Sequence, residues 1–157
     1  SFQAFLINHC LLYNQHLFDI IEVLEKNNLS VVPVLDKDKQ FQGVITSRKL
    51  LYTIANSAAI QSVGGVIILQ MNNNDYSMTE IANIIENNNT KILSSYVISK
   101  KDSTEMELTI KLNKSDISDV IRDLHRYDYN VKASFKENDP NTDFLDRYEQ
   151  LMRYLNP

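Results

Sequence analysis

Two cationic residues in this sequence have the charge and the position to bind an anionic ligand. Thr46, Arg48 and Lys49 follow the apolar residues 41–45, where a predicted strand ends and a predicted helix begins. The N-terminus of a helix favours an anion, because its first backbone N–H groups carry a partial positive charge. Lys49, helped by Arg48, would then contact a phosphate group. The alternative is structural: Thr46 ends the strand, and Lys49 is a solvated surface side chain.

The sequence contains no set of residues that marks a catalytic or a metal-binding site. His9, Cys10 and His16 are close together, but a zinc site needs three or four ligands, and His125 is far away along the chain. Cys10 and His16 have no third group with which to form a nucleophilic centre. Neither a glycine-rich phosphate loop nor the common zinc-protease and serine-hydrolase motifs occur. We therefore expect a protein that is not an enzyme and requires no metal or cofactor.

The composition narrows the class of protein further. The chain has 157 residues, a net charge of -4 and an isoelectric point near 5.3. A nucleic-acid groove draws its affinity from Lys and Arg, so we expect no nucleic-acid partner. No apolar run approaches the ~20 residues that a membrane helix needs, and the single cysteine fits a reducing compartment. We expect a soluble, cytoplasmic protein that does not bind membranes.

The first half of the chain contains the elements that must position the candidate site. An apolar stripe predicts a helix over residues 17–25, for which Asn14 is the expected N-cap. Two short strands follow at residues 31–35 and 41–45, joined by a charged turn. Ser47 is the expected N-cap of the helix after them.

The order helix, strand, turn, strand, helix over residues 8–58 resembles one CBS (cystathionine β-synthase type) repeat. The residues that carry the resemblance are Val32-Pro33-Val34, Asp36 and Gly43-Val44-Ile45-Thr46. The resemblance implies a ligand-sensing module, with AMP, ADP, ATP or a related adenosyl compound as the ligand. It also implies that main chain at Val32 and Pro33 frames the adenine and that Thr46 grips the ribose. The aspartate that the family places three residues later is Lys49 here, which can only donate hydrogen bonds.

CBS repeats work in pairs, and only one repeat is readable in this sequence. We expect this repeat to be the second of a pair whose first member lies upstream of this chain; the alternative is that a second copy of the chain supplies the partner repeat. A single repeat leaves apolar surface uncovered, so we expect the protein to self-associate.

Residues 66–136 predict the order strand, helix, strand, strand, helix, strand, which is the ferredoxin-like topology. Ser77 and Glu80 form an expected capping box at the start of the first helix. The third strand, residues 105–112, alternates apolar and polar side chains, which predicts an antiparallel sheet with one face on the core. The last strand is expected to direct three apolar residues inward: Val131, Ala133 and Phe135.

The lengths of these elements, and their place after a CBS repeat, make this half resemble an ACT domain, a regulatory module that binds amino acids and often dimerises. The resemblance implies three amino-acid-binding residues in the loop before the first helix: Asn74, Asp75 and Ser77. The alternative is an Asn-rich turn whose side chains satisfy local backbone groups. Tyr127 and Tyr129, which follow the second helix, are either an aromatic recognition patch or packing at the sheet edge.

The domain order resembles the acetoin-utilization family of bacterial CBS proteins. We expect an α+β chain with a CBS repeat at residues 1–62, an ACT-like domain at 63–138 and a helical tail at 139–157, with Gly64 and Gly65 near the first boundary. The tail has an apolar stripe and packs on its own domain or crosses to a partner. The leading hypothesis is a homodimer in which the CBS part binds a nucleotide and the ACT-like part mediates dimerisation. A ligand-free scaffold and an amino-acid sensor are the alternatives.

Overall fold

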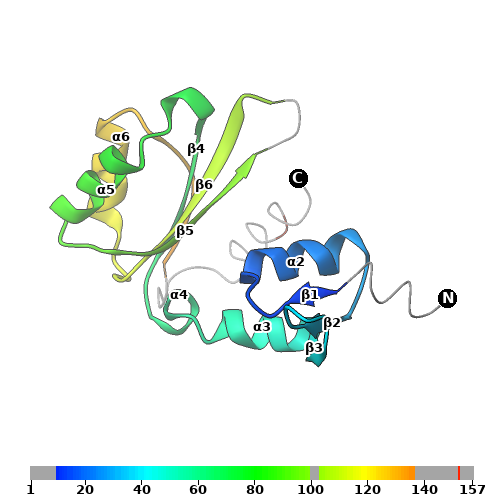
Figure 1. The fold of residues 1–157 in the computed structure, drawn as a ribbon. Coiled ribbons are helices and arrows are strands. Elements are labelled where there is room, and N and C mark those ends of the chain that lie inside the picture. Colours follow the sequence, from blue (N-terminus) through cyan, green and yellow to red (C-terminus); the bar gives the residue numbers. More distant parts are fainter. Residues whose placement is uncertain (1–9, 100–102, 137–151, 153–157) are drawn as a thin grey trace. The chain divides into compact units, whose positions relative to one another are not determined.

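The structure, a computed structural model, describes residues 10–99, 103–136 and Met152. The chain divides into two compact units, one ending at Gln61 and the next beginning at Ser62. The described residues form five α-helices and two β-sheets (Figure 1). The predicted α+β class is therefore confirmed.

The first unit is built on a three-stranded sheet with the order β1-β2-β3. The elements of this unit are β1 (Leu11–Leu12), α2 (Leu17–Lys26), β2 (Val31–Leu35), β3 (Phe41–Thr46), α3 (Ser47–Ala55) and α4 (Ala58–Gln61). β1 pairs with β2 in parallel, and β2 pairs with β3 in antiparallel orientation. Leu11, Leu24 and Val32 form the small buried core of this unit. The predicted order helix, strand, turn, strand, helix is confirmed.

Pro33 lies in the middle of β2, which is the central strand of this sheet. Proline has no N–H to donate, so a strand tolerates it where the ladder is interrupted on one side. β1 provides this interruption, because it pairs only with Val34 and Leu35 and stops short of Pro33. On the other side the ladder continues, and Pro33 pairs with Val44 of β3.

The N-cap of α2 is His16, so the expectation that Asn14 caps this helix is wrong. The His16 Nδ1 accepts a hydrogen bond from the Phe18 N–H at 3.2 Å, and the Asp19 carboxylate accepts one from the His16 N–H at 2.9 Å. Together these bonds form a capping box. Asn is a much commoner N-cap than His, but a neutral imidazole nitrogen can accept the same hydrogen bond.

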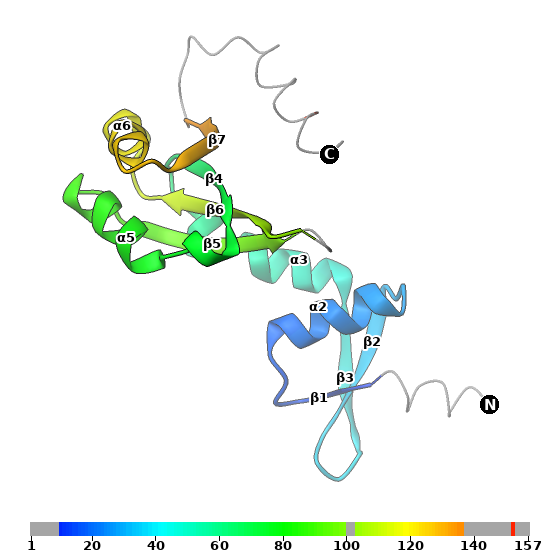
Figure 2. The same ribbon diagram turned by 90° about the horizontal axis from the view of Figure 1, so that it is seen from above.

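The second unit is a four-stranded antiparallel sheet with α5 and α6 on one face (Figures 1 and 2). The elements of this unit are β4 (Val66–Asn72), η1 (Asn73–Asp75), α5 (Met78–Asn87), β5 (Ile92–Ser99), β6 (Glu105–Leu112), α6 (Ser118–Arg126) and β7 (Asn130–Phe135). The strand order β5-β6-β4-β7 is that of the ferredoxin-like topology, which confirms the prediction. The main core lies between the helices and the sheet and includes Ile67, Leu69, Ile81, Ile85, Leu108, Ile110 and Leu124.

The last strand, β7, departs from the regular alternation that the sequence predicts. Val131 packs against the helix-side core, whereas Ala133 pairs directly with Ile68, which is not part of that core. Between these positions the register shifts, and Lys132 is the extra residue of a β-bulge. A one-residue shift moves every following side chain to the other face of the sheet. The expectation that Ala133 and Phe135 point into the helix-side core is therefore wrong.

Ser77 caps α5 as predicted, since its Oγ accepts a hydrogen bond from the Glu80 N–H at 3.3 Å. The expected second half of the capping box is replaced by a tertiary contact. The Glu80 carboxylate instead accepts a hydrogen bond at 2.8 Å from the hydroxyl of Tyr129, 49 residues later in the chain. The local sequence pattern thus predicted the Ser77 cap, but the Glu80 carboxylate binds the hydroxyl of Tyr129 and not the backbone of the N-cap.

Gly64 and Gly65 lie tightly against the end of β6. A Cβ on Gly64 would lie 1.9 Å from the Leu112 carbonyl oxygen, and a Cβ on Gly65 would lie 2.8 Å from the Ile117 Cδ1. The Gly65 N–H donates to the Lys114 carbonyl at 2.9 Å, and the Gly65 carbonyl accepts from the Leu112 N–H at the same distance. The two glycines permit this close approach of backbone segments.

Two predicted features lie largely or wholly outside the described residues. The hairpin between β5 and β6 includes residues 100–102, and the tail of residues 139–157 is described only at Met152, which is helical. In the parts of the chain that the structure does describe, no helix is long and apolar enough to cross a membrane.

Candidate functional site

Thr46 lies at the junction of β3 and α3, where it is both the last residue of the strand and the N-cap of the helix. Its Oγ1 accepts a hydrogen bond from the Lys49 N–H at 3.1 Å. The expectation that Ser47 is the N-cap is wrong, because Ser47 is the first helical residue and its N–H donates to the Ser30 carbonyl at 2.9 Å. Thr46 therefore starts the helix, and its hydroxyl hydrogen can still be donated to a ligand.

Arg48 and Lys49 place two positive charges at this same end of α3. Both residues are exposed. The Lys49 Nζ lies 5.1 Å from the ring centroid of Tyr52, a cation–π distance. The first turn of α3 has no acidic residue, so the side chains and the helix dipole favour an anion together. This junction, formed by Thr46, Arg48 and Lys49, is called the β3–α3 junction below.

Val32 and Pro33 come to the same end of the sheet, because Val31 pairs with Thr46 across the β2–β3 ladder. The side chain of Val32 is 0% exposed and belongs to the core. Pro33 is half-buried. These two residues can therefore offer a ligand mainly backbone groups, which is the role that the CBS resemblance implies for them.

Asp36, another residue of the CBS resemblance, holds the turn between β2 and β3. Its Oδ1 accepts hydrogen bonds from the N–H groups of Asp38 and Gln40 at 2.9 and 2.8 Å. Its Oδ2 accepts one from the Gln42 Nε2 at 2.7 Å. Both carboxylate oxygens are committed to the turn, so Asp36 has a structural role.

The first unit exposes a large amount of apolar surface. The most exposed apolar side chains are Phe18 at 72%, Leu51 at 68% and Phe41 at 65%. Further exposed members of this set are Leu12, Tyr13, Val31, Val44 and Tyr52. So many exposed large apolar side chains on one small unit favour a partner that covers some of them.

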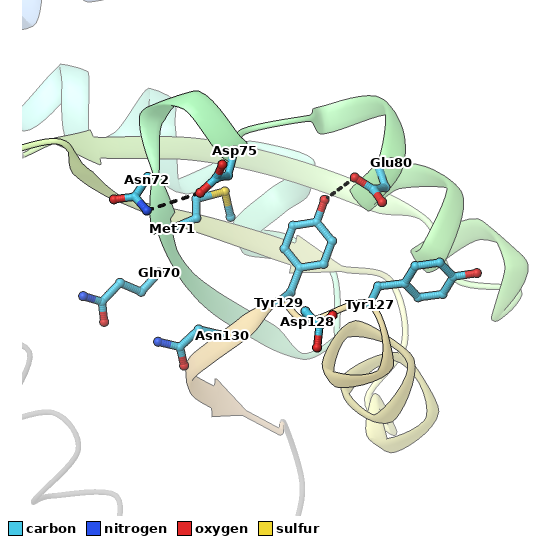
Figure 3. Close-up of a pocket in the computed structure, with 9 residues that line it drawn as sticks. All are labelled: Gln70, Met71, Asn72, Asp75, Glu80, Tyr127, Asp128, Tyr129 and Asn130. Carbon is cyan, nitrogen blue, oxygen red and sulfur yellow. Dashed lines mark hydrogen bonds between the residues drawn. The ribbon is translucent and has the colours of Figure 1, made fainter.

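A pocket of about 370 Å³ lies in the second unit, where the end of β4 meets the turn between α6 and β7 (Figure 3). The residues that line it are Gln70, Met71, Asn72, Asp75, Glu80, Tyr127, Asp128, Tyr129 and Asn130. The β4–β7 ladder brings the two segments together, because Gln70 pairs with Asn130. Amides, carboxylates and aromatic rings therefore surround one small volume.

The lining of this pocket is acidic. Asp75, Glu80 and Asp128 contribute carboxylates, and none of the lining residues is Lys, Arg or His. Asp75 accepts a hydrogen bond from the Asn72 Nδ2 at 3.2 Å. Burial, reinforced by the hydrogen bond to Glu80, raises the pKa of Tyr129 to about 12. The pocket therefore suits a cationic or neutral hydrogen-bond donor better than a free carboxylate.

The loop predicted to bind an amino acid contributes only in part to this pocket. Asp75 lines it, whereas Asn74 lies in η1 and Ser77 caps α5, and neither of these two is a lining residue. Tyr127 and Tyr129, which the sequence offered either as an aromatic recognition patch or as packing at the sheet edge, both line this pocket. Glu80 was expected only as part of the capping box, and no pattern in the sequence indicated that it lines a pocket.

Comparison with known families identifies the first unit. Residues 9–56 match the CBS domain family, so the CBS prediction is confirmed over that segment. CBS domains are commonly regulatory modules that sense small ligands, and proteins that contain them are typically regulatory rather than catalytic. No curated protein matches the chain. Within the described residues, no group of three or more His, Cys, Asp or Glu side chains could hold a metal ion.

Proposed function

We propose that this protein is a non-enzymatic regulatory module whose CBS part binds an adenine nucleotide and whose ACT-like second unit mediates dimerisation. The observation that carries the proposal is the β3–α3 junction within the CBS match, where a helix N-terminus, Arg48 and Lys49 converge. The same domain order underlies the resemblance to the acetoin-utilization family of bacterial CBS proteins. The nucleotide would act as a signal and would not be consumed.

The chemistry of the junction favours the phosphates over the ribose. A carboxylate could accept hydrogen bonds from both ribose hydroxyls, but Lys49 can only donate. The Thr46 Oγ1 already accepts a bond from the Lys49 N–H, so toward a ligand it acts chiefly as a donor. We therefore expect ATP and ADP to bind more tightly than AMP, and adenosine least, with affinity falling as salt screens the charges.

Pairing of CBS-type repeats would complete the site. The exposed apolar side chains of the first unit, Phe18, Phe41 and Leu51 among them, support a partner surface there. The partner is a second repeat, supplied by an upstream segment or by another copy of this chain. A nucleotide that contacts both repeats would favour one arrangement of them, provided that it binds the two arrangements with different affinities.

The edge strand β5 supports dimerisation through the second unit. It is eight residues long, contains neither charge nor proline, and exposes Tyr96, Val97 and Ile98. The opposite edge, β7, is protected by its bulge and by Lys132, which are common devices against edge pairing. We propose that β5 pairs with β5 of a second copy, so that the two sheets become continuous.

Thermal shift with AMP, ADP, ATP, S-adenosylmethionine and adenosine tests the nucleotide proposal. A ligand at about 1 mM with a Kd on the order of 10 µM stabilises the protein by ~2.7 kcal/mol, which raises Tm by several degrees. Lys49→Ala should reduce the shift with ATP, whereas Lys37→Ala, which removes an exposed lysine from the β2–β3 turn, should preserve it. Equal shifts in both variants would show that the junction is not the site. No shift with any compound would favour the ligand-free scaffold.

A second candidate function rests on the acidic pocket of the second unit. An amino-acid ligand would place its ammonium group, or a basic side chain, among Asp75, Glu80 and Asp128. We expect arginine or lysine to stabilise the protein and glutamate to have no effect. Asp128→Asn should remove the stabilisation, while Asp119→Asn on the exposed face of α6 should retain it. Stabilisation by glutamate equal to that by arginine would contradict this candidate.

A further inference from the structure

The pocket of the second unit combines hydrogen-bond acceptors with apolar surface. Its volume of about 370 Å³ lies within the range of small-molecule pockets, roughly 300–1,000 Å³. Met71 and the ring of Tyr129 supply apolar surface among the carboxylates and amides of the lining. Figure 3 shows the Tyr129 side chain reaching from the turn before β7 to Glu80 of α5. The pocket can therefore accommodate an alkyl chain as well as polar groups.

The polar groups of the pocket direct their donors to one another and leave acceptors for a ligand. The Gln70 Nε2 donates to the Glu105 carboxylate at 3.0 Å, and the Asn72 Nδ2 donates to Asp75 at 3.2 Å, so each amide keeps its oxygen as an acceptor. The Tyr129 hydroxyl donates to Glu80 at 2.8 Å. A ligand that brings several N–H donors and few acceptors fits this lining best.

The three carboxylates of the pocket are not neutralised by basic side chains. Among the residues that the structure describes, Asp75 and Glu80 accept hydrogen bonds only from uncharged groups. The carboxylate of Asp128 has no hydrogen bond or ion pair within the same part of the chain. An ammonium group brings three donors and a positive charge, and it can satisfy more than one of these oxygens.

The carboxylate of an amino-acid ligand would have no cationic partner among the lining residues. The guanidinium of Arg126 lies over the Tyr127 ring at 5.7 Å, but Arg126 pairs with Asp123 at 3.6 Å and does not line the pocket. The N-terminus of α5 would favour an anion, but it already has the acidic Glu80 in its first turn. Placing a carboxylate beside other carboxylates lowers affinity.

We propose that this pocket binds a linear aliphatic diamine or polyamine, which is a basic amine without a carboxylate. The proposal rests on the second candidate function and narrows its ligand class. One ammonium group binds Asp128, a second binds Asp75, and the alkyl chain between them lies against Met71 and the ring of Tyr129. The amide oxygens accept the remaining N–H donors. Lysine and arginine, which have the same basic groups, are the weaker ligands because of their carboxylate.

Cadaverine and lysine form a matched pair of probes, since cadaverine is lysine without the carboxylate. Isothermal titration calorimetry of the full chain, at fixed ionic strength and near neutral pH, measures both dissociation constants. Cadaverine should bind at least about tenfold more tightly than lysine, because like charges placed together oppose binding. Lysine binding equal to or tighter than that of cadaverine would overturn the proposal and leave the amino-acid candidate standing. Absence of binding by both compounds would overturn both.

Asp128→Asn tests whether the diamine binds in the pocket. Residue 128 has a φ of 62°, which Asn tolerates as Asp does, so this variant should fold. It should bind cadaverine about tenfold more weakly, since a charge-assisted hydrogen bond is lost.

Asp119→Asn is the matched control, because it removes the same charge from an exposed residue of α6 that does not line the pocket. This variant should retain the wild-type affinity for cadaverine. Equal losses in the two variants would show a general attraction of a dication to an acidic protein and would overturn the proposal. Unfolding without ligand verifies that both variants are folded, and Asp75→Asn replaces Asp128→Asn if the latter is not.

Discussion

At the scale of single residues, Thr46 illustrates how one side chain can have a structural role and a proposed ligand role. Its Oγ1 caps α3 by accepting the Lys49 N–H at 3.1 Å. The residue is also the hydroxyl position of the CBS resemblance. Thr46→Ala removes the capping oxygen and the hydroxyl donor together, so it cannot separate the capping role from the ligand role. A variant that retains a capping oxygen is needed for that.

We predict that Thr46→Ala destabilises the protein by about 1 kcal/mol through the loss of the N-cap, while Thr46→Asn, which retains a capping oxygen, stays near the wild type. Urea unfolding followed by circular dichroism measures both differences. Nucleotide affinity should fall in both variants if the hydroxyl contacts the ligand. Wild-type affinity in Thr46→Asn would instead leave Thr46 with the capping role alone.

The raised pKa of Tyr129 predicts that the free energy of unfolding depends on pH in the alkaline range. Its pKa is raised from 10.0 to about 12, first by burial and then by the hydrogen bond to Glu80. A raised pKa means that the folded state holds the proton more tightly than the unfolded state. The stabilisation is fully present below about pH 10, the unfolded pKa, and is lost as pH rises from there to about 12.

Thermal unfolding of the wild type and Tyr129→Phe between pH 9 and pH 11.5 checks this prediction. The difference in stability between the two proteins should narrow as pH rises above about 10. Absorbance titration should show one tyrosine of the wild type ionising later than the others. A constant difference across the range would mean that Tyr129 ionises normally in the folded protein.

At the scale of elements, the contact between Gly64 and β6 depends on the absence of a side chain. A Cβ at this position would lie 1.9 Å from the Leu112 carbonyl oxygen, which belongs to the sheet backbone. Backbone of a sheet moves at a greater cost than the end of a flexible side chain. The backbone conformation just before β4 is therefore tightly constrained, although it lies only two residues after the start of the second unit.

We predict that Gly64→Ala destabilises the protein by roughly 3 kcal/mol, because either β4 or β6 must shift. Val63→Ala is the matched control, since Val63 is adjacent and 56% exposed. Denaturant unfolding of both variants gives the comparison. A cost for Gly64→Ala no larger than that of the control would indicate that the two segments separate easily.

At the scale of the whole molecule, the proposed function depends on association, and the two edges of the second sheet differ in their capacity for it. β5 is uncharged along Ile92–Ser99, whereas β7 has a bulge and Lys132. We predict that Ile98→Lys weakens dimerisation at least tenfold, since lysine on an edge strand opposes pairing. Asn130→Lys, on the other edge, should leave it unchanged.

Sedimentation equilibrium over a range of protein concentrations measures both dissociation constants. A dimer that is equally stable in the two variants would exclude pairing through β5. The exposed apolar side chains of the first unit would then be the next candidate for self-association.

The sequence by itself determined those features that depend on short-range periodicity. The alternation of residues 105–112 predicted β6, and the apolar stripes predicted α2, α5 and α6, because the repeats of 2 and 3.6 residues are properties of a local segment. The CBS repeat was predicted from a resemblance to a known family, and the residues that carry the resemblance all lie within one short segment of the chain.

Tertiary structure alone decided the features that depend on register and on distant neighbours. The bulge at Lys132 placed Ala133 and Phe135 on the face opposite the helix-side core, because one extra residue inverts all that follow it. The acidic pocket exists because antiparallel pairing of β4 with β7 sets Gln70 beside Asn130. The Glu80 carboxylate does not form the expected local capping box, because it accepts a hydrogen bond from the hydroxyl of Tyr129, 49 residues later in the chain. Such contacts depend on the order and alignment of strands, which no local pattern encodes.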